Sequence, residues 1–199
     1  MTPISVLVEG NLDETVARKI IESEGGVVGE VYGRQGVDYI DKKIEGFNRL
    51  AQGTPILTLV DLMDVNLDCP VEIVQKWLPH RHEQMLLRFV VREIESWILA
   101  DRESISRFFG VRMPLIPHHP EDLKDPKATL VELASNSKKE GLKSAIVPPP
   151  EAMNDEGPAY TSRMQRFVRN QWSPIDAMEN APSLRRCIRA VHYLLDSST

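Results

Sequence analysis

Two short apolar runs that each end on a carboxylate place the strongest constraint on how this chain can fold. Residues 4–8 lead directly into Glu9, and residues 56–60 lead directly into Asp61. Continuous runs of aliphatic and β-branched residues are typical of strands that are buried on both faces of a parallel sheet. Because open α/β sheets bind ligands beyond the carboxyl ends of their strands, we expect Glu9 and Asp61 to lie at the functional edge.

The rest of the first half alternates between strand and helix patterns. Beyond the two apolar runs, we expect strands at 27–32 and 85–91 and helices at 14–24, 37–51 and 71–77. The first helix is expected to be capped by Asn11 or Asp13. This alternation predicts an α/β fold with a mainly parallel sheet of about four strands and right-handed crossovers.

The pattern changes to helices and loops in the second half of the chain. We expect a helix at 91–101, irregular structure at 113–126, a loop at 147–158 and a last helix at 182–195. We therefore divide the chain into an α/β domain at 1–135 and a C-terminal helical extension at 136–199, which packs on the same domain.

Composition narrows the class of protein. The chain has 199 residues, and its net charge of -5 argues against a uniformly basic nucleic-acid-binding protein. A local basic patch or bound metal ions would still allow contact with nucleic acid. Cys69 and Cys187 are far apart and form no CxxC pair. With no signal-peptide pattern and no apolar run near 20 residues, we expect a reduced, cytoplasmic protein without a membrane segment.

Further acids follow the same predicted strand ends. Gly10 permits a sharp turn after Glu9, Asp13 follows it, and Asp64 and Asp68 follow Asp61. Clustered like charges repel each other unless protons or a cation hold them together. Carboxylate oxygens are the ligands that Mg²⁺ and Mn²⁺ prefer. The simpler alternatives are that Asp13 favours the helix N-terminus and that the later aspartates belong to a polar loop.

The segment that follows the predicted strand at 85–91 contributes two more acids. Glu95 falls in the first turn of the predicted helix, from which it can reach the same crevice, although the helix dipole alone also favours an acid there. Glu93 is expected to point elsewhere, and Trp97 is expected to be part of the core.

Other kinds of site have weaker support. His80, His82 and His118 lack the spacing and the cysteine partners of a zinc site. Neither the Gly25-Gly26 pair nor the segment 33–36 forms a phosphate-binding loop, so we do not expect ATP hydrolysis by this chain. No nucleophile-elbow motif indicates serine catalysis.

Several of these segments together resemble a known family. The stretches VLVEGNLDETVARKII and ILTLVDLMD resemble the TOPRIM module of topoisomerases, bacterial primases, small RNA-maturation nucleases and OLD-type nucleases. The stretch RFVVREIESWILAD and residues 125–127 resemble a small stand-alone TOPRIM-like bacterial family related to the OLD-type branch. The resemblance covers residues 4–127, and it departs from the module at DLMD, where the module has DxD.

The resemblance implies a metal-dependent phosphodiesterase that acts on DNA or RNA, with a separate ATPase partner in a phage-defence setting. It implies Glu9, Asp61 and Lys127 as catalytic residues, with Lys127 close to the scissile phosphate. The implied Mg²⁺ or Mn²⁺ ligands are Glu9, Asp13, Asp61, Asp64 and Glu95.

Two other functions stay open. One is a non-catalytic TOPRIM-like module that binds an ATPase or nucleic acid. The other is a receiver-like phosphoacceptor domain, because LTLVDLMD is similar to the strand that carries a phosphorylated aspartate. The missing acidic pair after the first strand argues against the receiver.

Overall fold

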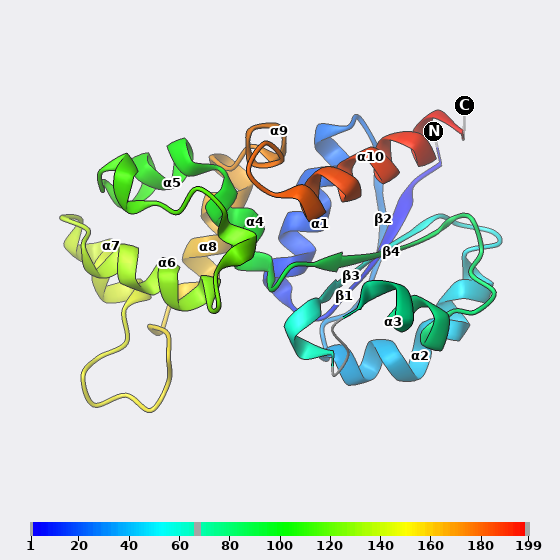
Figure 1. Cartoon of the computed structure of the whole chain (residues 1–199), viewed down its shortest axis with the longest axis horizontal. Helices are drawn as coiled ribbons and strands as arrows, with labels where there is room; N and C mark the ends of the chain where they lie inside the picture. Colours follow the sequence, from blue (N-terminus) through cyan, green and yellow to red (C-terminus); the bar gives the residue numbers. More distant parts are fainter. Residues whose placement is uncertain (1, 66–68, 198–199) are drawn as a thin grey trace.

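The computed structural model describes residues 2–65 and 69–197. Within them, four parallel strands form one sheet in the order β2-β1-β3-β4 (Figure 1). The strands are β1 (Ile4–Val8), β2 (Val28–Gly33), β3 (Ile56–Asp61) and β4 (Met85–Val90). This confirms the expected parallel α/β sheet, and a Rossmann-like arrangement is consistent with it.

The two central strands are the two apolar runs. Every residue of β1 is buried, as is every residue of β3 except Asp61 at its end. These strands are hydrogen-bonded neighbours, with Val6 level with Leu57, so their carboxyl ends lie side by side. At the other side of β3, Asp61 is level with Val90 at the end of the edge strand β4.

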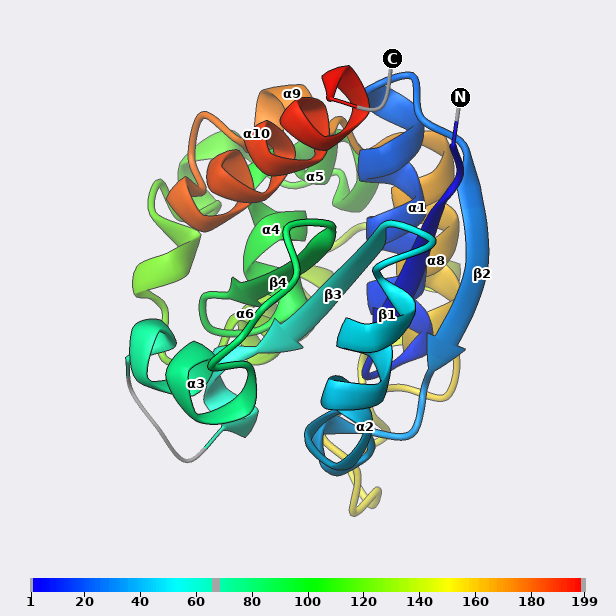
Figure 2. The ribbon, with the colours of Figure 1, turned by 90° about the vertical axis from the view of Figure 1, so that its right-hand side faces the viewer.

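Helices cover both faces of the sheet (Figures 1 and 2). On one face a large core includes Val16 of α1, Trp97 of α4, Phe167 of α8 and Leu184 of α10. These helices are α1 (Asn11–Ser23), α4 (Ile94–Ala100), α8 (Tyr160–Asn170) and α10 (Pro182–Asp196). On the other face a smaller core is built from the sheet, α2 (Val37–Leu50) and α3 (Pro70–Trp77).

Apart from one short segment after β3, the remaining elements follow the sheet in sequence, and α5 to α8 gather at one end of the molecule (Figure 1). The helices are α5 (Arg102–Phe109), α6 (Pro126–Ser135), α7 (Glu140–Ile146) and α9 (Pro174–Ala177). Short 3-10 segments are η1 (Leu62–Asp64), η2 (Met113–Leu115) and η3 (Pro120–Asp122). Of the helices described, none combines the length and apolar character needed to cross a bilayer.

Two helix starts differ from expectation. Helix α1 begins at Asn11 with Gly10 as its N-cap, so neither Asn11 nor Asp13 is the capping residue and Asp13 lies inside the first turn. Helix α4 begins at Ile94 rather than at residue 91, after Glu93 as its N-cap residue. Both helices therefore start within a few residues of a strand end, which brings their first-turn acids close to that end.

Candidate acidic site at the strand ends

Glu9 and Asp61 meet at the carboxyl ends of β1 and β3. The Oε1 atom of Glu9 accepts a hydrogen bond of 2.7 Å from the backbone N–H of Asp61. The backbone on the other side of Glu9 is also fixed, because its carbonyl accepts a hydrogen bond of 3.1 Å from the N–H of Gly36. The structure thus brings together the two carboxylates that the apolar runs placed at this edge.

The turn after β2 helps to shape the site. Gly33 has a φ of 91°, and a Cβ atom there would lie 2.2 Å from the carbonyl oxygen of Val8. Only glycine allows the backbone to pass this close to the end of β1. The next residue, Arg34, also has a positive φ and pairs with Glu14 of α1 at 3.1 Å. This turn therefore packs directly against the residues that precede Glu9.

Asp13 lies in the first turn of α1, one turn beyond Glu9. Its side chain is buried, and its Oδ2 atom lies 3.0 Å from the position that a Cβ atom would take at Gly10. The glycine therefore leaves room for this carboxylate close to the strand end. Two carboxylate oxygens at this edge, Oδ1 of Asp13 and Oδ1 of Asp61, are buried without a hydrogen-bond partner among the described residues.

Helix α4 adds Glu95 to the same region. Glu95 is buried, and its Oε1 atom accepts a hydrogen bond of 2.9 Å from the hydroxyl of Tyr160 at the start of α8. The negative charge of Glu95 contributes to raising the pKa of Asp61. Asp64, in η1, is exposed and adds a further negative charge near Glu9 and Asp13.

Burial and mutual repulsion raise the pKa values of the cluster. Burial raises the pKa of Glu9 to about 8, assisted by the charges of Asp64 and Asp13 and opposed by the N–H of Asp61. Burial also raises the pKa of Asp13 to about 6 and that of Glu95 to about 7. The pKa of Asp61 lies well above its usual range for the same reason. Several carboxyl groups are therefore poised to titrate near neutral pH, which is a feature of functional sites.

The chemistry of this cluster suits a hard divalent cation, but its present geometry does not enclose one. All the donors are carboxylate oxygens, and two buried oxygens have no partner among the described residues. Nevertheless, no group of three or more His, Cys, Asp or Glu side chains in residues 2–65 and 69–197 is arranged to hold a metal ion. A cation would have to draw the carboxylates together from where they lie. Asp68, which follows the second acidic motif, is outside the described residues.

Lys127 lies at the first turn of α6, and its two ends contact different acids. Its backbone N–H donates a hydrogen bond of 2.7 Å to Oε1 of Glu93, and its Nζ atom forms an ion pair with Glu156. The ammonium group also lies 5.2 Å from the centre of the Tyr160 ring. Burial lowers the pKa of Lys127, but the hydrogen bond and charge of Glu156, together with the charges of Glu95 and Glu93, outweigh burial, so the net shift is upward. Lys127 therefore approaches the acidic site while its charge is engaged by Glu156.

Three residues around the site were not expected from the sequence. Glu93 was expected to point elsewhere, yet it is buried and binds the backbone of Lys127, because α4 starts after it. Tyr160 and Glu156 lie about 30 residues beyond Lys127 in a segment without a recognisable motif. For Tyr160 the one available signal is an aromatic residue at the start of an amphipathic helix, which by itself indicates core packing.

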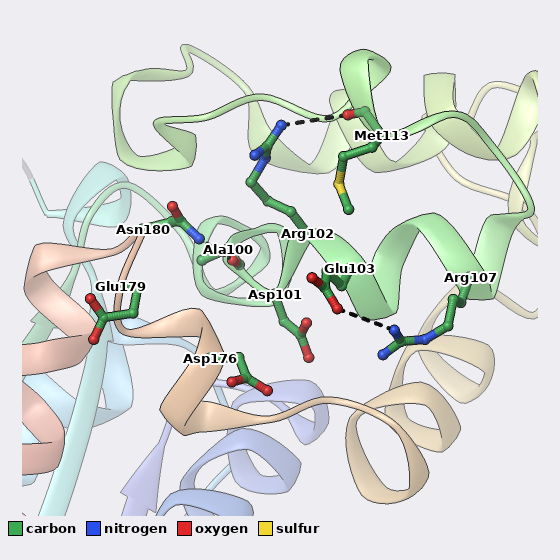
Figure 3. Close-up of a pocket in the computed structure, with 9 residues that line it drawn as sticks. All are labelled: Ala100, Asp101, Arg102, Glu103, Arg107, Met113, Asp176, Glu179 and Asn180. Carbon is green, nitrogen blue, oxygen red and sulfur yellow. Dashed lines mark hydrogen bonds and ion pairs between the residues drawn. The ribbon is translucent and has the colours of Figure 1, made fainter.

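A cavity of about 320 Å³ lies between α5 and α9, away from the strand-end acids, and contains none of them (Figure 3). Most of its charged groups are engaged with protein partners. Arg107 pairs with Glu103 at 3.4 Å, and Arg102 donates to the carbonyl of Met113 at 3.5 Å. Asp101 accepts hydrogen bonds from backbone N–H groups in α5 and before α9. These contacts hold the helical lobe together, so the strand-end cluster is the better candidate site.

Comparison with known proteins does not place the chain in a family. No family model, no curated protein and no solved structure matches it. The interpretation of the acidic site therefore depends on its residues and their geometry.

Proposed function

We propose that this chain is a metal-dependent phosphodiesterase that cleaves DNA or RNA at the strand-end acidic site. The observation that carries the proposal is the pair of buried oxygens, Oδ1 of Asp13 and Oδ1 of Asp61, which lie beside Glu9 without a partner among the described residues. Burial of a carboxylate without compensation is costly, so such oxygens call for protons or a cation. Of these two, the resemblance of the strand-end motifs to TOPRIM nucleases favours a bound cation.

Each acid has a distinct role in this proposal. Glu9, Asp61 and Asp64 would hold one Mg²⁺ or Mn²⁺ ion, and Asp13 and Glu95 would hold a second. Ions bound in this way supply an activated water and stabilise the oxygens of a phosphodiester. The residues of the chain provide orientation: the N–H of Asp61 fixes one oxygen of Glu9, and the hydroxyl of Tyr160 fixes one oxygen of Glu95.

Lys127 would supply positive charge for a substrate phosphate. Its ammonium group is close enough to Glu95 and Glu93 for their charges to act on its pKa. The ion pair with Glu156 holds that charge at the border of the site, and an incoming phosphate would compete with the Glu156 carboxylate for it. We include a separately encoded ATPase partner in the proposal, because the sequence has no phosphate-binding loop of its own.

A cleavage assay tests the proposal directly. The purified chain is incubated with plasmid DNA, linear DNA or RNA in Mg²⁺, Mn²⁺ or EDTA, with and without an ATPase encoded beside it. We expect cleavage in Mn²⁺ or Mg²⁺, none in EDTA, and none with Asp61→Asn. Asp41→Asn, at an exposed position of α2, is the matched control and should cleave like the wild type. Cleavage that survives Asp61→Asn, or no cleavage in any condition, refutes the proposal.

A non-catalytic binding module is the second candidate. It is favoured by the absence, within the described part of the chain, of three acids already arranged around a metal position. Nucleic-acid binding without cleavage in the same assay would support this function. Labelling of Asp61 by acetyl phosphate would instead support the receiver-like alternative.

A further inference from the structure

An open groove with three arginines runs along the edge strand β4, between α3 and α10. Its volume is about 340 Å³, and we call it the arginine groove after Arg81, Arg88 and Arg186. Figure 2 shows α10 and α3 on opposite sides of β4. The walls include Val71, Leu87 and Phe89, and none of the described residues that line the groove is acidic. This is notable in a chain whose net charge is -5.

Arg88 is the central residue of the arginine groove. It comes from β4 itself and is half-buried, and its Nε atom is fully buried without a hydrogen-bond partner among the described residues. Arg81 and Arg186 are exposed, and no hydrogen bond or ion pair joins the side chain of either to a described side chain or backbone group. Burial lowers the pKa of Arg88, and the positive charges of Arg81 and Arg186 lower it further. An anion bound among the three would satisfy the Nε donor and relieve this repulsion.

A simpler role for one such charge is protection of the open sheet edge. Edge strands often carry an inward-pointing charged residue that prevents pairing with another chain. That role needs Arg88 alone. It does not account for two further arginines on the helix and loop that border the same groove, nor for the absence of acids among the described lining residues.

The arginine groove lies close to the acidic site along the direction of the strands. Arg88 is level with Leu59 of β3, and two residues further along, Val90 is level with Asp61. At the usual spacing of residues in a strand, the level of Arg88 and the level of Asp61 are about 7 Å apart along the sheet. Side chains alternate between the faces of a strand, so Arg88 shares its face with Leu86 and Val90, which pack in the same core as Leu59. Asp61, two residues after Leu59, is on that face as well.

We propose that the arginine groove binds the phosphate backbone of a nucleic-acid strand and leads that strand to the Glu9–Asp61 site. The choice of nucleic acid as the polyanion rests on the proposed function. Arginine guanidinium groups bind phosphate oxygens with paired hydrogen bonds. The exposed Val71 and the partly exposed Phe89 in the walls of the groove offer apolar surface for sugars and bases. Although the chain is acidic overall, the groove provides a local basic surface that a nucleic acid can contact.

Binding can be measured separately from cleavage. A fluorescently labelled single-stranded DNA 20-mer is titrated with the full chain in EDTA, and anisotropy is recorded over a series of NaCl concentrations. The variant Arg81→Gln/Arg186→Gln changes exposed side chains and should fold normally, which circular dichroism checks. Arg88→Gln is measured as well. The matched control is Arg166→Gln/Arg169→Gln, which removes two exposed arginines from α8.

We expect the Arg81→Gln/Arg186→Gln variant to bind at least about tenfold more weakly at low salt. The slope of the logarithm of the association constant against the logarithm of the NaCl concentration should become shallower by about 0.7 for each phosphate that an arginine no longer neutralises. Arg88→Gln should weaken binding in the same direction, and the α8 control should bind like the wild type. Wild-type protein that does not bind the 20-mer, or a groove variant that binds no more weakly than the α8 control, overturns the proposal.

The two proposals fail in different ways. If the wild-type chain binds DNA in EDTA through the arginine groove but never cleaves with Mn²⁺, the groove proposal stands and the nuclease proposal is refuted. If the chain cleaves with Mn²⁺ while its groove variants bind DNA as tightly as the wild type, the nuclease proposal stands and the groove proposal is refuted.

Discussion

Glu9→Gln should make the metal-free protein more stable at neutral pH. In the folded chain, burial raises the pKa of Glu9 to about 8, whereas an unfolded glutamate has a pKa of 4.5. Between these two values the unfolded chain loses this proton and the folded chain keeps it, so stability falls as pH rises. At pH 7 the loss is about 3 kcal/mol, at 1.36 kcal/mol per pH unit above 4.5.

Glutamine removes this loss while keeping the local structure. Its amide oxygen can still accept the hydrogen bond that Glu9 accepts from the N–H of Asp61. The variant should therefore unfold at higher urea concentration than the wild type at pH 7 in EDTA, by up to about 3 kcal/mol. At pH 5 the difference should shrink to less than about 1 kcal/mol, because the unfolded chain is then only partly ionised.

Metal should reverse the order of stability. In Mn²⁺ the wild type should gain stability by mass action, and Glu9→Gln should gain less because it has lost one carboxylate ligand. Calorimetry should show weaker Mn²⁺ binding by the variant in the same buffer. Glu72→Gln, at an exposed position of α3, is the control and should follow the wild type. A Glu9→Gln protein no more stable than the wild type at pH 7 in EDTA would refute the electrostatic reasoning.

Three further changes test the surroundings of the site. Tyr160→Phe should cost about 1 kcal/mol in urea unfolding and, because it removes a hydrogen bond that lowers the pKa of Glu95, should move the pH profile of cleavage upward. Gly33→Ala should cost at least about 2 kcal/mol in the same unfolding assay, since its Cβ would overlap the last carbonyl of β1. Glu156→Gln should lower the pKa of Lys127 and speed its modification by an amine-reactive reagent, followed by mass spectrometry at about pH 9.

The sequence predicted the strand ends because their signal is local. A buried parallel strand appears as a continuous apolar run, and the residue after it must lie at the sheet edge. Glu9 and Asp61 could be assigned in this way without knowledge of anything else in the chain. The start of α1 was missed by three residues because glycine, rather than Asn11 or Asp13, occupies the N-cap position.

The surrounding residues could not be predicted because they meet through long-range packing. Tyr160 reaches Glu95 across 65 residues, and this contact depends on how α8 and α4 each pack against α1. The same applies to Arg88, whose pattern in β4 is that of a single polar residue in an apolar strand. Its partners Arg81 and Arg186 come from a loop and from the last helix, and only the folded chain shows that they share a groove.

The arginine groove attracts a polyanion and the metal-free acidic site repels it. In the proposed function, the binding of metal therefore affects the binding of nucleic acid. Without metal, an approaching phosphate is attracted by Arg88 and its neighbours and repelled by whichever acids are ionised. Because the pKa of Glu9 is about 8 and that of Glu95 about 7, this repulsion grows as pH rises from about 6 to about 8. Two divalent cations bound there would displace the protons and offset most of the negative charge of the five carboxylates, so the repulsion of a phosphate would fall. In the proposed function, metal and nucleic acid therefore strengthen each other's binding, and by linkage the factor is the same in both directions.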